Sequence, residues 1–213
     1  MIPSIPLIPP EQRTIVYNSY QMTSAIYSSP VLYRWAMKLR FRNYYVPRLE
    51  KVAAEIPRGA RVIDLCCGDC AIYRRFLMKN DVDYLGIDIS VDMVQKVAKE
   101  GIVIEARDVR IYVPPKSDVI ICLGALLHFP AEAEAVIERA KNAARKVIVL
   151  EPVKYASWFH LQPVMMLASR FCDFGEGPVR FRYSEDALVD LWRELNVSKI
   201  ERVGSEIMGI WEL

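Results

Sequence analysis

The sequence predicts an α/β fold in which helices cover both faces of a mostly parallel sheet. Two observations predict the parallel part: from Arg61 onward short apolar segments alternate with helical ones, and each apolar segment is continuously apolar. Strands of that kind are buried on both faces, as in a three-layer α/β/α sandwich. The third observation is the end of the chain, where two strand-like segments meet at a turn and predict an antiparallel hairpin.

The candidate strands and helices of the parallel part alternate regularly. We expect strands at 61–66, 82–88, 102–107, 117–123 and 145–151, and helices at 71–79, 91–100 and 131–143. Right-handed crossovers between parallel strands bring all their carboxyl ends to one edge of the sheet, which is where ligands bind. A functional site is therefore expected at that edge.

The C-terminal part combines one helix with the hairpin. Ser184 is a candidate N-cap for a helix that runs to Leu195. The segments NVSKIERVG and SEIMGIWEL follow as two strands, and Gly204-Ser205 between them is a hairpin signal. With these two strands the predicted sheet is seven-stranded.

The part of the chain before the first strand has a different character. Residues 1–12 are a proline-rich arm that we expect to be extended. From 13 to 54 the pattern is mostly helical, interrupted at Pro30 and Pro47, and Pro57-Arg58-Gly59 makes a turn into the first strand. We therefore expect an N-terminal helical lid ahead of the sheet.

The length and composition indicate one globular domain. A chain of 213 residues is expected to build a single core, with a lid at 1–57, a core at 58–213 and a substrate-side insertion at about 152–183. The hydrophobic content of 53% and the charged content of 25% are typical of globular proteins. The net charge of +2 argues against a dedicated nucleic-acid binder, which needs a strong basic excess.

Sequence features also indicate where in the cell the protein is expected. No apolar stretch reaches the length that spans a membrane. The start, MIPSIPLIPPEQR, lacks a basic n-region and is broken by prolines, so we do not expect a secretory signal. Five cysteines are an odd number and three of them cluster within 66–70, so we expect no disulfide framework and a cytoplasmic location.

The most informative segment is RVIDLCCGDC at 61–70. An apolar strand runs into a tight turn of small residues and then into a helix, an arrangement that brings backbone N–H groups and a helix N-terminus against a ligand. The next strand, YLGID, ends in Asp88, about 20 residues past the turn, the offset at which an acid binds ribose hydroxyls. Together they predict a site for an adenosine-type cofactor.

The segment resembles motif I of the class I S-adenosylmethionine-dependent methyltransferases, in which a strand ends in D-x-G-x-G-x-G. Asp64, Gly68 and Asp69 match, whereas Cys66 and Cys70 replace the first and third glycines. We expect that neither cysteine position requires a positive φ, because that would strain a residue other than glycine. The resemblance extends from about Arg61 to Pro152 and points to the small-molecule (type 11/12-like) branch. It implies a Rossmann-like sheet of order 3-2-1-4-5-7-6.

The resemblance implies a set of residues for S-adenosyl-L-methionine. Asp88 would accept hydrogen bonds from both ribose hydroxyls, for which a carboxylate is suited; the alternative is a solvated strand-end acid. Ile89 and Met93 would lie near the adenine, with core packing the alternative for Met93. Asp108 would accept the adenine amino group beside the Val109 backbone, with a turn-forming role as the alternative.

The remaining cofactor residues follow from the same resemblance. Asp64 would lie in the turn and bond backbone N–H groups, or the cofactor amine through water. Small side chains in the turn would let the cofactor touch the main chain, and the backbone after strand 4 would accept the methionine ammonium group. The residues concerned are Cys66, Cys67, Gly68, Leu123 and Gly124.

The lid supplies one more candidate. In related enzymes a tyrosine about 35 residues before motif I closes over the cofactor carboxylate, and Tyr27 is nearest to that offset among Tyr17, Tyr20, Tyr27 and Tyr33; a buried lid tyrosine without cofactor contact is the alternative. The lid also carries a basic stripe interleaved with aromatic residues. It predicts an anionic substrate, a peripheral membrane contact or a solvated helix face. The stripe is Arg34, Lys38, Arg40, Arg42 and Arg48.

Methyl transfer is an in-line displacement that needs alignment, desolvation and often a base. The chain has two histidines, and His128 lies just past strand 4 at the active edge, where it is the candidate for base or substrate contact, or has a structural role. His160 lies in the aromatic and Met-rich segment WFHLQPVMM, which we expect either to line the acceptor pocket or to form an ordinary helix core. Glu151 is a third polar candidate. Cys67 and Cys70 form C-x-x-C without a second pair, so no metal site is expected.

These observations favour S-adenosylmethionine-dependent methyl transfer to a small-molecule or lipid-like acceptor, with no nucleic-acid partner. A nicotinamide-dependent oxidoreductase would want G-x-G-x-x-G, and CCGDCA lacks its first and last glycine. A nucleic-acid or protein methyltransferase would need a basic groove or its own motif after strand 4, such as D/N-P-P-Y. A non-catalytic cofactor-binding or regulatory protein remains the alternative outside enzymology, because a cofactor motif does not prove turnover.

Overall fold

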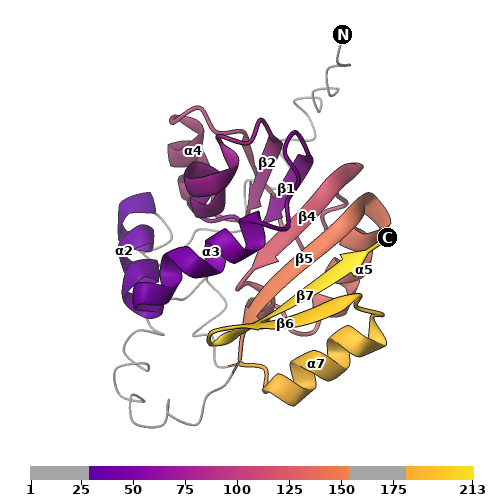
Figure 1. Cartoon of the computed structure of the whole chain (residues 1–213). Coiled ribbons are helices and arrows are strands. Elements are labelled where there is room, and N and C mark those ends of the chain that lie inside the picture. Colours follow the sequence, from indigo (N-terminus) through magenta and orange to yellow (C-terminus); the bar gives the residue numbers. More distant parts are fainter. Residues whose placement is uncertain (1–28, 154–180) are drawn as a thin grey trace.

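The computed structural model describes residues 29–153 and 181–213, and their centre is a seven-stranded sheet of order β3-β2-β1-β4-β5-β7-β6 (Figure 1). Neighbouring strands from β3 to β5 are parallel, and β7 runs antiparallel to both β5 and β6. The predicted order and the C-terminal hairpin are therefore confirmed. The strands are β1 Arg61–Leu65, β2 Asp83–Asp88, β3 Ile104–Ala106, β4 Ser117–Leu123, β5 Ala144–Pro152, β6 Lys199–Val203 and β7 Glu206–Glu212.

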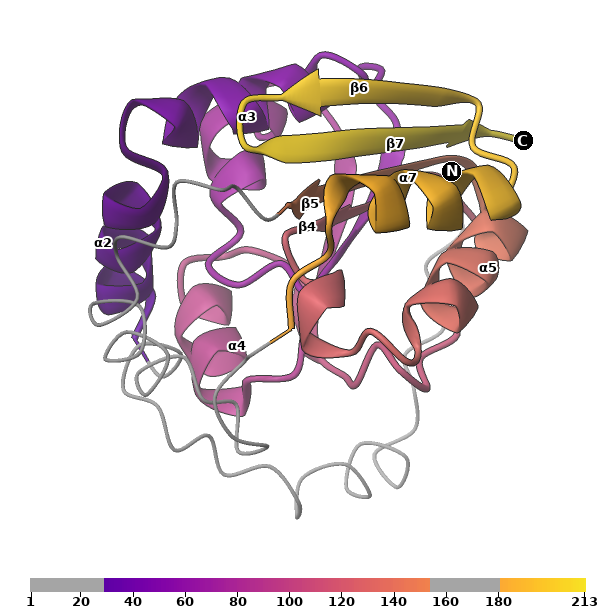
Figure 2. The same ribbon diagram turned by 90° about the horizontal axis from the view of Figure 1, so that it is seen from below.

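Helices cover both faces of this sheet. Figure 2 shows α3 and α4 on one side and α5 and α7 on the other, with α2 beside α3 at the edge. The helical elements are α2 Pro30–Phe41, η1 Arg42–Tyr44, α3 Tyr45–Ala53, η2 Tyr73–Leu77, α4 Val91–Ala98, η3 Leu126–His128, α5 Ala133–Ala143 and α7 Glu185–Glu194. The predicted three-layer sandwich is thus present.

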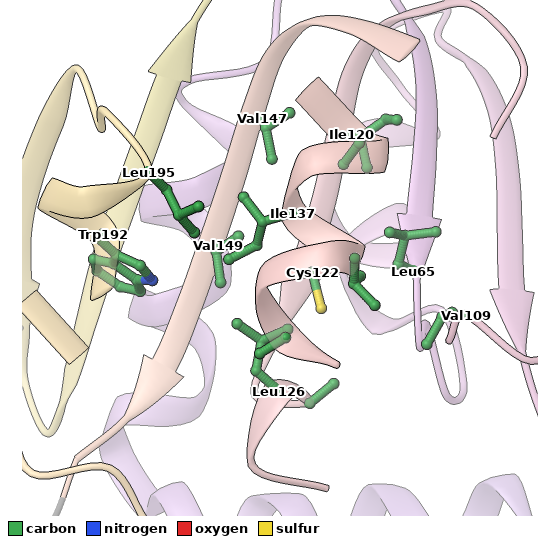
Figure 3. Packing of buried hydrophobic residues seen from close by; sticks show 14 of the residues in the cluster. Leu65, Val109, Ile120, Cys122, Leu126, Ile137, Val147, Val149, Trp192 and Leu195 are labelled. Carbon is green, nitrogen blue, oxygen red and sulfur yellow. The ribbon is translucent and has the colours of Figure 1, made fainter. Parts of the chain in front are cut away.

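The alternation of side chains along β4 explains why this strand is apolar throughout. Val119 and Ile121 pack into the cluster under α3, η2 and α4, whereas Ile120 and Cys122 pack into the cluster under α5 and α7. Figure 3 shows the second cluster, with Ile137 of α5 turned toward the sheet. Because both faces are buried, no position of the strand centre is free for a polar residue.

Several local signals act as predicted. Ser184 caps α7 by accepting a hydrogen bond from the Ala187 N–H at 3.2 Å, and Gly204 turns the β6–β7 hairpin with φ +60°. Pro47 does not interrupt a helix, because it lies in the first turn of α3, where a missing N–H costs nothing. The predicted arm, the first part of the lid and most of the proposed insertion lie outside the described residues.

Candidate functional site

A cavity of about 330 Å³ lies at the carboxyl edge of the sheet, beneath α2 and α3. Its walls come from the ends of β1, β2 and β4, from the loop after β3, and from the lid helices. The predicted cofactor residues in the described part of the chain line it, and so does His128, whereas Glu151 does not; Tyr27 and His160 lie outside the described residues. The predicted residues in the lining are Asp64, Cys66, Cys67, Gly68, Asp88, Ile89, Met93, Asp108, Val109, Leu123, Gly124 and His128.

The turn after β1 corrects one expectation. Cys66 and Cys70 both have φ of 56°, in the left-handed region that favours glycine. The turn imposes this conformation, because the Cys67 N–H donates to the Ile87 carbonyl at 3.0 Å and the Cys70 N–H donates to the Cys67 carbonyl at 2.9 Å. Each cysteine therefore stores about 1–2 kcal/mol of backbone strain where the family carries glycine.

The thiols of Cys66 and Cys67 are kept protonated. A hydrogen bond with Cys122 and burial raise the pKa of the Cys66 thiol well above its usual 9.0. Burial, together with a hydrogen bond with Cys70, raises the pKa of Cys67 in the same way. Because thiolate is the nucleophilic and metal-binding form, these cysteines serve as small uncharged residues of the turn. Among the described residues no group of three or more His, Cys, Asp or Glu side chains is arranged to hold a metal ion.

Asp88 joins the turn to the next helix. Its Oδ2 accepts the Gly68 N–H at 2.8 Å, and its Oδ1 accepts the Ser90 N–H at 2.9 Å. Burial raises the pKa of Asp88 despite these hydrogen bonds. Each carboxylate oxygen keeps a second lone pair, so the side chain can still accept hydrogen bonds from a ligand in the cavity.

Asp64 has a different partner from the one expected. It accepts a hydrogen bond from the Tyr84 hydroxyl at 2.7 Å, rather than bonding N–H groups of the turn. Its side chain is buried, and burial raises its pKa to about 7. The physical reason is that β1 and β2 are adjacent and Tyr84 pairs across from Val62, which places its hydroxyl beneath the turn.

Asp108 is paired with Arg110. The Arg110 guanidinium donates to both carboxylate oxygens, at 3.0 Å to Oδ1 and 2.8 Å to Oδ2, and its N–H donates to Oδ1 at 2.9 Å. Burial acts to raise the pKa of Asp108, and the hydrogen bonds from Arg110 outweigh it, so the pKa lies below its usual value. Asp108 is therefore an ionised acceptor in the cavity wall.

The turn after β4 brings His128 to the cavity. Gly124 adopts φ +71° and its N–H donates to the Leu150 carbonyl at 2.6 Å, after which η3 places Leu127 and His128 in the wall. Glu151 lies behind this turn and does not line the cavity, although the sequence suggested a polar candidate at the active edge. It is fully buried and accepts backbone N–H groups of the turn instead.

Two lid residues that the sequence indicated only as members of larger groups, Tyr33 among the lid tyrosines and Arg34 in the basic stripe, contact the first turn. The ring of Tyr33 occupies the space that a Cβ on Gly68 would take, 2.9 Å from that position. Arg34 forms an ion pair with Asp69 at 3.4 Å, and burial raises the pKa of Asp69 to about 6. The helix α2 therefore lies directly over the turn. The signal for Tyr33 was its place among the lid tyrosines, but only the fold could select it.

Arg48 was predicted as part of a surface stripe and is instead buried. Its Nε donates to Glu206 Oε2 at 2.5 Å and its Nη2 to Oε1 at 2.9 Å, while its guanidinium lies 4.2 Å from the centre of the Phe41 ring. Arg48 also lines the cavity next to Gly124. Lys38 is exposed, and the side chains of Arg40 and Arg42 lie outside the described part. None of the helices in 29–153 and 181–213 combines the length and apolarity that a membrane crossing needs.

Comparison with known families finds a match for the central part of the chain, which includes the ends of β1, β2 and β4 in the site. Residues 62–146, from β1 to β5, match the family model described as "Methyltransferase domain". This part of the chain is similar to a methyltransferase domain. The resemblance to the class I enzymes that motif I indicated is thereby confirmed. No curated protein sequence matches the chain.

Solved structures of methyltransferases share the fold of this chain. Magnesium protoporphyrin IX methyltransferase from Synechocystis PCC 6803 with bound SAH has 19% identity and a TM-score of 0.61 over 80% of this chain and 84% of that one. The same enzyme with bound SAM has 17% identity and a TM-score of 0.57 over 82% of each chain. A SAM-dependent methyltransferase and possible histamine N-methyltransferase from Thermotoga maritima has 15% identity and a TM-score of 0.65 over 88% and 97%. The TM-scores show a common fold, and identities this low show nothing beyond it.

Proposed function

We propose that the cavity binds S-adenosylmethionine and that the protein transfers its methyl group to a small-molecule or lipid-like acceptor. One observation carries the proposal: a single cavity connects Asp88, Asp108 and Gly124, the three points where the resemblance places ribose, adenine and methionine. A volume of about 330 Å³ is within the usual range for small-molecule sites. The structures with bound SAM and SAH that share this fold support it.

The residues of the cavity fit the two ends of such a cofactor. Asp88 is held by Gly68 and offers acceptors for the ribose, while Ile89, Met93 and Val109 supply apolar surface for the adenine. At the other end the Gly124 backbone is available to an ammonium group. The guanidinium of Arg48 lines the cavity beside Gly124, where its Nη2 would lie 3.6 Å from a Cβ on that glycine, and a guanidinium suits a carboxylate.

The acceptor side of the cavity is mostly apolar. S-adenosylmethionine, when bound, supplies a methyl group on a sulfonium. The chain's own contribution is to exclude water and align the acceptor, which are the main requirements of such a displacement. His128 is the polar side chain that we assign to the acceptor, as base or substrate contact. The apolar wall favours a partly hydrophobic acceptor and consists of Met37, Phe41, Leu49, Leu127, Phe129 and Phe181.

The alternatives are weaker. A nicotinamide-binding protein would continue the parallel sheet after β5, whereas this sheet ends in an antiparallel hairpin. A non-catalytic cofactor-binding protein would bind the cofactor without turning it over. Detection of methyl transfer to an acceptor separates that alternative from the proposal.

Calorimetric titration of the purified protein tests the cofactor. We expect binding of S-adenosylmethionine and S-adenosylhomocysteine with micromolar affinity, and no binding of NADH or NADPH. Binding of a nicotinamide cofactor alone would overturn the assignment, because the turn would then serve a different ligand.

The Asp88→Ala variant tests the site itself. We expect it to weaken S-adenosylhomocysteine binding by about 1.5–3 kcal/mol, the scale of a hydrogen bond that involves a charged group. Asp83→Ala, at the exposed start of the same strand, is the matched control and should bind as the wild type does. Unchanged affinity in a folded Asp88→Ala protein would remove Asp88 from the site.

A further inference from the structure

Glu151 is a buried carboxylate that does not touch the cavity yet holds the turn that forms one of its walls. It is the penultimate residue of β5, and its side chain is fully buried. Its Oε1 accepts the Ala125 N–H at 2.5 Å and the Leu126 N–H at 2.8 Å. Both N–H groups stand at the start of η3, where a helical turn leaves its donors without partners of its own.

A carboxylate is a costly group for this position. Burial without full hydrogen bonding is unfavourable, and the second oxygen, Oε2, has no hydrogen bond within the described part of the chain. The buried Glu206 carboxylate close by adds repulsion. An apolar side chain would avoid these costs, but it could not accept the two N–H groups. What Glu151 contributes is therefore a fixed acceptor for the turn.

That turn carries functional positions on both sides of the two N–H groups. Leu123 and Gly124 precede them and Leu127 and His128 follow them, and all four line the cavity. The Gly124 N–H is tied to Leu150, the residue before Glu151, at 2.6 Å. The end of β5 thus fixes the turn at three consecutive N–H groups.

We propose that Glu151 is a positioning residue that holds the turn from Gly124 to His128 in the conformation that receives the methionine end of the cofactor. The proposal rests on the proposed function. In this proposal β5 contributes to cofactor binding indirectly, because its Glu151 holds the turn after β4. Loss of the Glu151 acceptor displaces the Gly124 backbone and leaves the adenosine end, at Asp88, in place.

Two variants and two ligands test this. Glu151→Gln keeps the reach and one acceptor oxygen, whereas Glu151→Asp keeps the charge but is one methylene shorter. We expect the Glu151→Gln variant to bind S-adenosylhomocysteine as the wild type does. The Glu151→Asp variant should bind it about tenfold to a hundredfold more weakly, which is the scale of one lost hydrogen bond to a charged group. Adenosine, which lacks the methionine part, should bind equally to both variants.

The matched control is Asp118→Asn. Asp118 accepts the Arg61 N–H at 2.8 Å at the opposite end of β4, so it is also a carboxylate that ties backbone between strands, but far from the cavity. It should leave both ligands unaffected. Equal weakening of both ligands by Glu151→Asp would indicate a merely structural role. Wild-type affinity in the Asp variant, or weakening in the Gln variant alone, would overturn the proposal. Failure of the wild type to bind S-adenosylhomocysteine would instead reject the proposed function.

Discussion

At the scale of single residues, the turn after β1 shows that a motif can keep its geometry without its glycines. Cys66 and Cys70 stand where motif I has glycines and take the left-handed conformation that favours glycine, which hydrogen bonds of the turn, one of them to β2, enforce. Both side chains pack against or within the core, and a hydrogen bond with Cys122 together with burial raises the pKa of Cys66, which keeps that thiol uncharged. The protein thus tolerates strain at the turn in exchange for side-chain packing.

Cys66→Gly should therefore change stability little. Relief of about 1–2 kcal/mol of strain offsets the backbone entropy of a new glycine, about 0.5–1 kcal/mol, and the lost packing of one thiol. We expect a free energy of unfolding within about 1 kcal/mol of the wild type by urea denaturation. Cys122→Gly, in extended β4, has no strain to release and should lose about 2 kcal/mol. Equal losses at the two positions would contradict the strain argument.

Buried acids whose pKa is raised make stability depend on pH, Asp64 and Glu151 among them. Burial raises the pKa of Asp64 and of Glu151 to about 7 in the folded protein, above their usual 3.8 and 4.5. Between about pH 4 and about pH 7 the folded state therefore binds more protons than the unfolded state, and stability falls as the pH rises.

Glu151→Gln should remove its part of this dependence. The raised pKa of Glu151 corresponds to roughly 3 kcal/mol across the window, since one pKa unit is about 1.4 kcal/mol. Urea unfolding at about pH 5 and about pH 8 should show a smaller difference for Glu151→Gln than for the wild type. Glu201→Gln, on the half-exposed face of β6, is the control. A pH dependence identical to that of the wild type would show that Glu151 does not titrate in this range.

At the scale of elements, local sequence signals predicted what depends on neighbours in the chain. The Ser184 cap and the Gly204 hairpin are short-range features, and the continuously apolar strands reflect burial on both faces. The predicted strand at 102–107 is shorter than expected because β3 is an edge strand that pairs only with the end of β2. The φ of Cys66 and the burial of Arg48 could not be predicted, since contacts between distant segments decide both.

The β6–β7 hairpin also packs against the lid. A Cβ on Gly204 would overlap the ring of Tyr44 in η1, and its φ of +60° disfavours any side chain. Gly204→Ala should therefore cost about 1–2 kcal/mol from φ alone, plus the displacement of Tyr44. In a protein that also carries Tyr44→Ala, Gly204→Ala should lower the free energy of unfolding only by the amount due to the positive φ. Urea unfolding measures this difference. An equal loss in both backgrounds would show that the ring moves away freely.

At the scale of the whole molecule, one buried ion pair joins distant parts of the sequence. Arg48 in α3 and Glu206 at the start of β7 are 158 residues apart, and both are nearly inaccessible to solvent. The pair fixes the lid to the last strand of the sheet. It also places Arg48 beside Gly124, so the same contact shapes the cavity.

Breaking this pair on one side should be costly. Arg48→Met leaves the Glu206 carboxylate buried without its partner, and we expect a loss of about 3–5 kcal/mol in urea unfolding. The Arg48→Met, Glu206→Met double variant should lose less than the sum of the single variants, because no unpaired charge remains. Additive losses would mean that the two side chains contribute independently.

The walls of the cavity come from α2 and α3, from the ends of several strands, and from Phe181 beyond β5. A compound that occupies the cavity therefore contacts several elements at once. If it binds only the folded protein, it raises the free energy of unfolding in proportion to the logarithm of its concentration once the cavity is saturated. The melting temperature therefore reports whether the cavity is occupied, and the measurement does not require the reaction product to be known. Under the proposed function, an acceptor that fills the space beside the cofactor should raise the melting temperature further in the presence of S-adenosylhomocysteine.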